Sequence, residues 1–213
     1  MLKILPLRLH GILFWIAALV LLGFLLPRFV GAALFDPNLL LAYSFLSIPF
    51  LSPLACQAVA QRRYPLSWTV AAAALFGWVS SLLLIALRIL GANRQIQAPS
   101  LVMPDLPVLL SLSLIALASS LFGASLAAIL TLSTGKADAA MRIMRSGFLL
   151  ILLAIVFMVR NGSNSIGDFI SSQLTYSAMP KFAIIISLIL LAHAVLFLTL
   201  SLRRASRLPT PDS

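Results

Sequence analysis

Six long runs of apolar residues decide what this chain can fold into. The runs cover residues 11–26, 39–60, 68–90, 106–132, 147–159 and 182–202. The hydrocarbon core of a bilayer is about 30 Å thick and is crossed by roughly 20 residues of helix, because lipid cannot satisfy an open backbone. The pattern predicts an all-helical bundle of six transmembrane spans, which forms one integral membrane domain over residues 1–213. The fifth run has only 13 residues, so it must extend into residues 141–146, tilt, or be partly re-entrant.

The composition excludes a soluble domain and several kinds of catalytic site. Hydrophobic residues make up 62% of the chain and charged residues 9%, whereas soluble domains have about 25% charged residues. The chain has no glutamate, and its five aspartates lie outside the apolar runs, which excludes paired buried carboxylates. The single cysteine, Cys56, allows neither an internal disulfide nor a cluster of thiolate metal ligands. We therefore expect no catalytic residues, no metal and no cofactor.

Lysine and arginine are unequally divided between the two sides of the predicted bundle. One side carries ten of the 15 basic residues: Lys3, Arg8, Arg62, Arg63, Lys136, Arg142, Arg145, Arg203, Arg204 and Arg207. The other side carries Arg28, Arg88, Arg94, Arg160 and Lys181. Short loops retain positive charge on the cytoplasmic side, so both termini are predicted to be cytoplasmic, with the chain in the inner (plasma) membrane. Topology thus explains the net charge of +10, and a nucleic-acid partner is not expected because no soluble basic face exists.

Small residues recur along the fourth run in two neighbouring rows. One row is Ala116, Ser120, Ala124 and Ala128, and the other is Ser119, Gly123 and Ala127. Membrane helices associate largely by close packing at small residues. The rows predict packing within the bundle, with a subunit interface as the alternative.

Two places in the apolar runs are candidates for a substrate pathway. Pro49 and Pro53 lie near the middle of the second run, with Ser52 beside Pro53. Proline frees a backbone carbonyl one turn earlier, and broken helices line substrate sites in transporters; a kinked structural helix is the alternative. His193 lies near the middle of the sixth run, where an ionisable residue is a functional candidate. It could also serve packing alone, or act as base for Ser119, Ser120 or Ser125 in a small intramembrane enzyme, the less favoured possibility.

Segments at the edges of the runs have amphipathic or signal-like patterns. In the external segment 163–179, Ile166, Phe169, Ile170 and Leu174 recur at helical spacing, which predicts either a helix in the outer headgroup layer or a gating element. The inner segments 1–10 and 137–145 combine basic and apolar residues, which favours anchoring to the inner leaflet. The first run also resembles a secretory signal, but it is longer than the usual 7 to about 15 residues, which favours an uncleaved helix.

The overall layout resembles the permease subunit of an export-type ABC transporter. The resemblance rests on six spans, cytoplasmic termini, a basic segment before the first span and an amphipathic external segment before the last. The proline-containing second run leads into Gln61, Arg62 and Arg63, which is similar to the place where that family enters its ATPase-coupling loop. The resemblance implies a dimer of this subunit with a separate ATPase chain. The inner loops 61–67 and 133–146 would then dock the ATPase through Arg62, Arg63, Lys136, Arg142 and Arg145.

The sequence as a whole therefore favours a non-catalytic membrane subunit of a transporter, and within that class it favours an exporter of an apolar or amphipathic substrate. Charged residues are scarce in the spans, and ion conduction or proton relay usually needs them. The alternative is a structural or assembly protein that packs against other membrane subunits through its small-residue faces.

Overall fold

The computed structural model describes residues 9–21, 40, 43–45, 47–96, 104–160 and 179–207, and within these the side chains of 15–21, 40, 43–45, 48, 51–91, 93, 104–150 and 179–207. The principal elements are α1 (Leu9–Val20), α4 (Ser47–Gln61), α5 (Leu66–Ile96), α6 (Leu106–Thr134), α7 (Ala137–Arg160) and α9 (Met179–Ala205). The described residues contain helices and short connections without any strand, so the predicted all-helical class is confirmed for them.

Three of these helices are long and apolar enough to span a membrane. They are Leu66–Gly91, Leu106–Thr134 and Met179–Ala205, which correspond to the third, fourth and sixth runs. Only three of the six predicted spans are therefore supported. Within the described residues, α1 and α4 have 12 and 15 residues, whereas a span requires roughly 20. α7 has 24 residues, but its first part carries three charged residues, Asp138, Arg142 and Arg145. It is not one of the three helices that are apolar enough to span a membrane.

Local sequence explains where the helices stop at one end of the bundle. α4 and α5 are joined by residues 62–65 alone, in which Arg62 has a positive φ of 49°. α6 ends at Gly135, whose φ is 68° and whose N–H donates to the carbonyl of Thr131 at 2.9 Å. Glycine adopts this left-handed conformation without the penalty of a Cβ atom, which makes it a common helix terminator. After Lys136 the chain turns directly into α7, so the turns that the fifth run lacked are supplied by residues 137–146.

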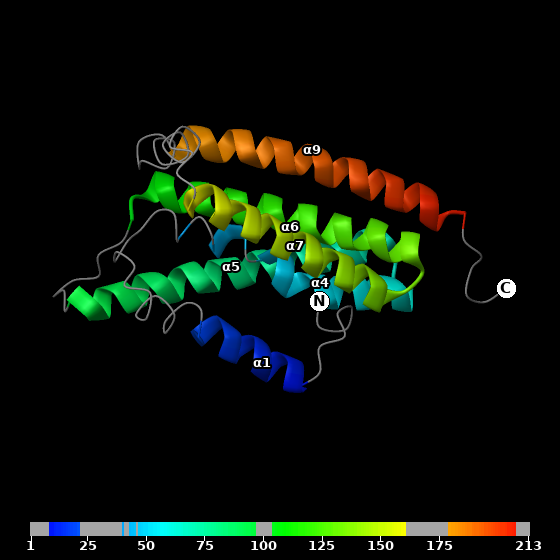
Figure 1. Cartoon of the computed structure of the whole chain (residues 1–213), viewed down its shortest axis with the longest axis horizontal. Helices are drawn as coiled ribbons and strands as arrows, with labels where there is room; N and C mark the ends of the chain where they lie inside the picture. Colours follow the sequence, from blue (N-terminus) through cyan, green and yellow to red (C-terminus); the bar gives the residue numbers. More distant parts are fainter. Residues whose placement is uncertain are drawn as a thin grey trace.

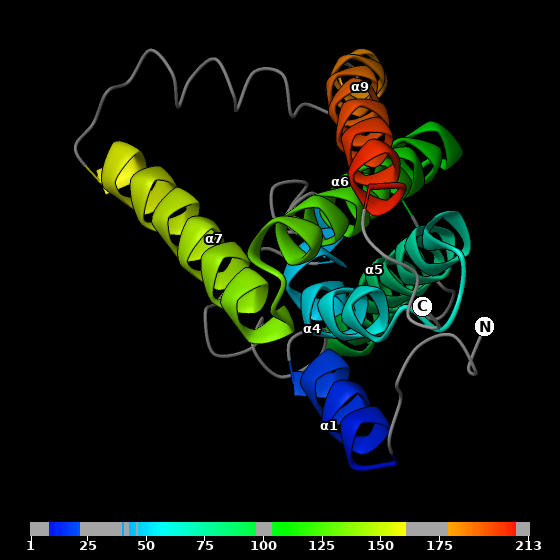
Figure 2. The same ribbon diagram turned by 90° about the vertical axis from the view of Figure 1, so that its right-hand side faces the viewer.

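α6 is the central helix of the bundle (Figures 1 and 2). α4, α5, α7 and α9 all pack against it, and α1 packs against α5. α4, α6 and α9 run in one direction and α5 and α7 in the other (Figure 1). Both predicted small-residue rows of α6 are buried within the chain. This confirms their prediction as internal packing surfaces.

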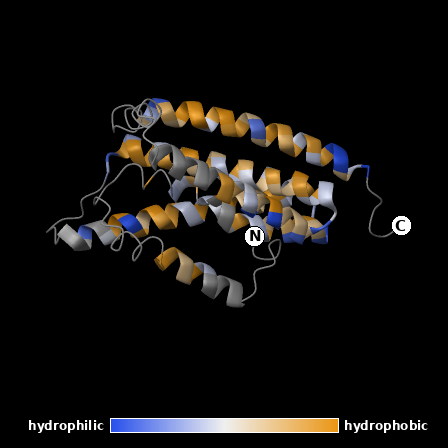
Figure 3. Ribbon diagram, viewed as in Figure 1, coloured by the Kyte–Doolittle hydropathy of each residue, from blue (hydrophilic) through white to orange (hydrophobic). Residues whose placement is uncertain are grey.

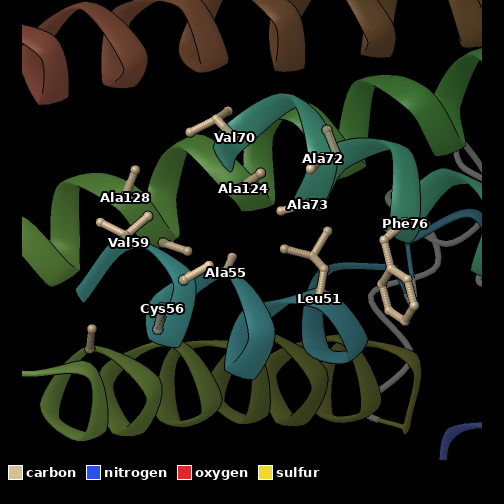
Figure 4. Packing of buried hydrophobic residues seen from close by; sticks show 14 of the residues in the cluster. Leu51, Ala55, Cys56, Val59, Val70, Ala72, Ala73, Phe76, Ala124 and Ala128 are labelled. Atoms are coloured by element: carbon tan, nitrogen blue, oxygen red, sulfur yellow. The ribbon is translucent and has the colours of Figure 1, made fainter. Parts of the chain in front are cut away.

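The core between α4, α5 and α6 is closely packed (Figure 4). A Cβ atom added to Gly77 of α5 would lie 2.5 Å from Leu51 Cδ2 and 2.9 Å from Ser120 Oγ. One added to Gly123 of α6 would lie 3.2 Å from Ile48 Cγ1. The absence of side chains at these two glycines therefore lets the three helices approach one another, and the interdigitated contacts stabilise the bundle through dispersion.

α9 makes up the outer layer on one side of α6 (Figure 2). Only 17% of the residues in its most apolar stretch are buried within the chain. The buried positions are mostly small residues, Ala183, Ser187, Ala194 and Ser201, together with Met179. The rest of the helix presents isoleucine, leucine and valine outward (Figure 3), as expected for a helix that faces lipid.

Candidate functional site

Basic side chains gather at one end of the bundle. The α4–α5 connection, the α6–α7 connection and the C-terminal end of α9 all lie there (Figures 1 and 3). The exposed basic residues at this end are Arg62, Arg63, Lys136, Arg142, Arg145, Arg203, Arg204 and Arg207. Asp138 is the one acid that the described residues place among them. We call this group the basic end. It brings together all five residues predicted to dock a partner.

The local structure of the predicted docking residues differs from the loops expected from the sequence. The segment 133–146 is not a loop, because α7 begins at Ala137. Alanines and an aspartate in the first turn favour helix there, the aspartate through the helix dipole. Arg142 and Arg145 therefore project from a helix, and Arg142 Nε donates to the carbonyl of Asp138 at 3.4 Å. Arg62, Arg63 and Lys136 lie in connections of four and two residues.

The opposite half of the bundle contains a buried arginine. Arg88 of α5 is 1% exposed and is the largest fully buried side chain among the described residues. It interacts electrostatically with Tyr43, which is itself buried. Tyr43 belongs to an apolar cluster with Leu19, Leu40, Leu84, Ile85, Ile89, Val108, Leu112 and Met179. Taking a cation out of water costs several kcal/mol unless it is well partnered. The groups around Arg88 must therefore compensate for the loss of its hydration.

Hydrogen bonds hold the chain around Tyr43 against α6. Ser44 Oγ donates to the carbonyl of Leu112 at 3.2 Å, and Ser119 Oγ donates to the carbonyl of Ser44 at 2.7 Å. Both serines are completely buried. Tyr43 is thereby held in place beside Arg88 by two bonds between helical segments. Such bonds between membrane helices contribute about 0.6 to 2 kcal/mol each.

The sequence interpretation missed the burial of Arg88. It assigned this residue to the outer side, at the end of the third run, as one of five charges there. α5 instead continues to Ile96, eight residues or about 12 Å of helix beyond Arg88. The available signal was the absence of proline before residue 99, together with apolar residues on both sides of Arg88.

The predicted pathway residues of α4 lie in different environments. Pro49 falls in the first turn of α4, where proline removes no helical hydrogen bond. Its side chain is outside the described residues. Pro53 lies inside the helix and is partly buried, and Ser52 is 1% exposed. Ser52 therefore belongs to the packed interior of the bundle.

His193, the other pathway candidate, lies on the outer surface of α9. Its side chain is exposed, and its Nδ1 is 2.7 Å from the carbonyl of Ile189 in the same helix. The ring packs edge-on to Phe122 of α6 at 6.5 Å and lies 6.4 Å from Phe197. Ser119 and Ser120, two of the serines for which it could act as base, donate to backbone carbonyls instead. These contacts are those of a packing residue.

Several predictions lie outside the described residues. They are the external amphipathic segment 163–179, of which the structure describes only Met179, and residues 1–8 of the basic N-terminal segment. The described residues contain no group of three or more histidine, cysteine or acidic side chains that could hold a metal ion.

The chain matches no known family model, no curated protein and no solved structure. Its class therefore rests on its own features. It is a helical protein with three helices long and apolar enough to span a membrane, which is compatible with a membrane location.

Proposed function

We propose that this chain is a non-catalytic membrane subunit of a transporter, with six spans and both termini on the cytoplasmic side of the inner membrane. In this proposal it works as an ABC-type export permease. A separate ATPase chain binds its basic end, and two copies of the chain form the transport unit. The cargo is an apolar or amphipathic molecule.

The basic end is the observation that carries this proposal. Eight exposed cations and one acid from three separate segments meet there. Positive charge in short connections is retained on the cytoplasmic side. A surface of one sign also selects a partner of the opposite sign. An acidic face on a cytoplasmic ATPase would meet both conditions.

The hairpin of α4 and α5 could transmit a movement from the basic end into the interior of the bundle. Arg62 and Arg63 lie in a four-residue connection, so a force on them acts directly on both helices. α4 carries Pro53 between two and three turns from the connection, and α5 carries Arg88 farther along. In the proposal, partner binding shifts these two helices against α6.

Close packing favours a second candidate function, a structural or assembly protein. The contacts of Gly77 with Leu51 and Ser120 leave no space between α4, α5 and α6 at that level. A rigid interior of this kind suits a scaffold. Its partners would then be other membrane subunits that bind the outward face of α9, which is largely unburied.

Copurification from the native host separates the two candidates. The chain is purified in mild detergent, and associated proteins are identified by mass spectrometry, for the unchanged chain and for Arg62→Glu/Arg63→Glu. The matched control is Lys181→Glu, an exposed cation at the other end of the bundle. A stoichiometric ATPase that is lost with the double variant and kept with the control supports the transporter. Other membrane subunits without an ATPase, or the chain alone, would overturn it.

A further inference from the structure

The outward face of α7 carries its basic and apolar residues in a fixed order. Arg142, Arg145 and Leu149 follow one another at intervals of three and four residues, which places them in one stripe of the helix. All three are exposed, Leu149 by 55%. The neighbouring Leu150 is 66% exposed. The charged part of this face therefore lies nearer the start of α7, and the apolar part lies farther along.

The opposite face of α7 fixes its depth in the bundle. Ala140 and Met144 are buried against the core that α4 helps to form. Met144 Sδ lies 4.0 Å from Cys56 Sγ, and Cys56 points toward α7 in Figure 4. Cys56 is five residues before the end of α4, or about 8 Å along the helix. Met144, and Arg145 next to it, thus lie about one headgroup layer inside the end of α4, since that layer is roughly 5 to 8 Å thick.

This depth distinguishes the arginines of α7 from those of the α4–α5 connection. Arg62 and Arg63 follow the last turn of α4, where a cytoplasmic protein can reach them. Arg142 and Arg145 lie on the side of a helix, and the exposed Leu149 and Leu150 follow them one turn farther along α7. Toward its far end, α7 leads away from α6 (Figure 2). An arginine with its stem along apolar surface and its guanidinium at the interface is suited to a phosphate group.

We propose that Arg142 and Arg145 form a binding site for the headgroup of an anionic phospholipid of the inner leaflet. The guanidinium groups bind the lipid phosphate, and the acyl chains lie along Leu149 and Leu150. The site removes Arg142 and Arg145 from the part of the basic end that would dock an ATPase and leaves docking to the residues of the connections. It does not depend on such a partner. From the sequence, Arg142 and Arg145 had two expected roles, docking of a partner protein and anchoring of segment 137–145 to the inner leaflet, and the proposed site assigns them to lipid.

Native mass spectrometry of the purified full chain tests this site. Phosphatidylglycerol and phosphatidylcholine with the same acyl chains are added separately, and the affinity for the first bound lipid is measured. The unchanged chain should prefer phosphatidylglycerol. Arg142→Gln/Arg145→Gln should reduce that preference by about fivefold or more, the effect of losing basic residues at an anionic interface. Arg142→Lys/Arg145→Lys should keep most of the preference.

The matched control is Arg203→Gln/Arg204→Gln, which removes the same charge from the same end of the bundle but from α9. It should leave the preference within about twofold, because a local site is insensitive to charge elsewhere. An equal loss in both Gln variants would show a diffuse charge effect and overturn the proposal. So would a chain without preference, or a preference that inorganic phosphate abolishes. The assay contains no ATPase, so its outcome is separate from that of the copurification.

Discussion

The basic end of the bundle exposes its arginines, whereas the other half of the bundle buries one, Arg88. At the basic end, exposed arginines cluster with Lys136 and are accessible to solvent, lipid or a partner. In the other half, Arg88 is enclosed beside Tyr43 and an apolar cluster. Exposed charges contribute little to stability, whereas a buried charge depends on every group around it. The same residue type therefore serves a surface at one end and the interior at the other.

Removing Arg88 should have the largest effect. Arg88→Ala deletes a long buried side chain and leaves Tyr43 without its electrostatic partner, which should cost about 3 to 5 kcal/mol of unfolding free energy. Arg88→Met fills most of the same volume without a charge and should be close to neutral or stabilising. Unfolding of both variants in denaturing detergent, monitored by circular dichroism, measures the difference in their unfolding free energies. Equal, small losses for the two would contradict the burial of Arg88.

Filling the contact between α4, α5 and α6 should have an intermediate effect. Gly77→Ala places a methyl group 2.5 Å from Leu51 Cδ2, and overpacking of a close core costs about 1 to 3 kcal/mol. Gly147→Ala is the control, because nothing lies within 4 Å of its added Cβ. It should be neutral or slightly stabilising, since alanine is the better helix former. The same unfolding measurement applies, and a loss as large for Gly147→Ala would argue against the packing described here.

Replacing His193 should have the smallest effect. Its polar contact is to its own helix, and its side chain is exposed on α9. His193→Phe should therefore change the unfolding free energy by less than about 1 kcal/mol and leave membrane insertion unchanged. If copurification identifies a transport partner, transport by His193→Phe should also be unaffected. A loss of transport with normal insertion would restore His193 to the pathway.

Hydropathy predicted the helical class and the three spans that the structure supports, because long apolar runs such as 106–132 allow few other folds. The charge distribution predicted which residues meet at the basic end. Two features needed three-dimensional information. Arg88 looked like a residue of the outer side because the third run ends two residues after it, at residue 90. α5 nevertheless continues, and Asn93 Nδ2 donates back to the carbonyl of Ile89 at 2.8 Å. The depth of Arg145 follows from the Cys56–Met144 contact, a pairing that no local pattern shows.

The central claim is that the basic end of the bundle faces the cytoplasm and the opposite end faces outward. Chemical labelling of the two ends tests it most directly. In a Cys56→Ser background, Arg63→Cys marks the basic end and Lys181→Cys marks the opposite end, where both native side chains are exposed. A membrane-impermeant maleimide is applied to intact cells whose inner membrane is accessible, and again after permeabilisation. The account predicts that Lys181→Cys is labelled in intact cells and that Arg63→Cys is labelled only after permeabilisation. Labelling of Arg63→Cys in intact cells, or of both positions together, would contradict it.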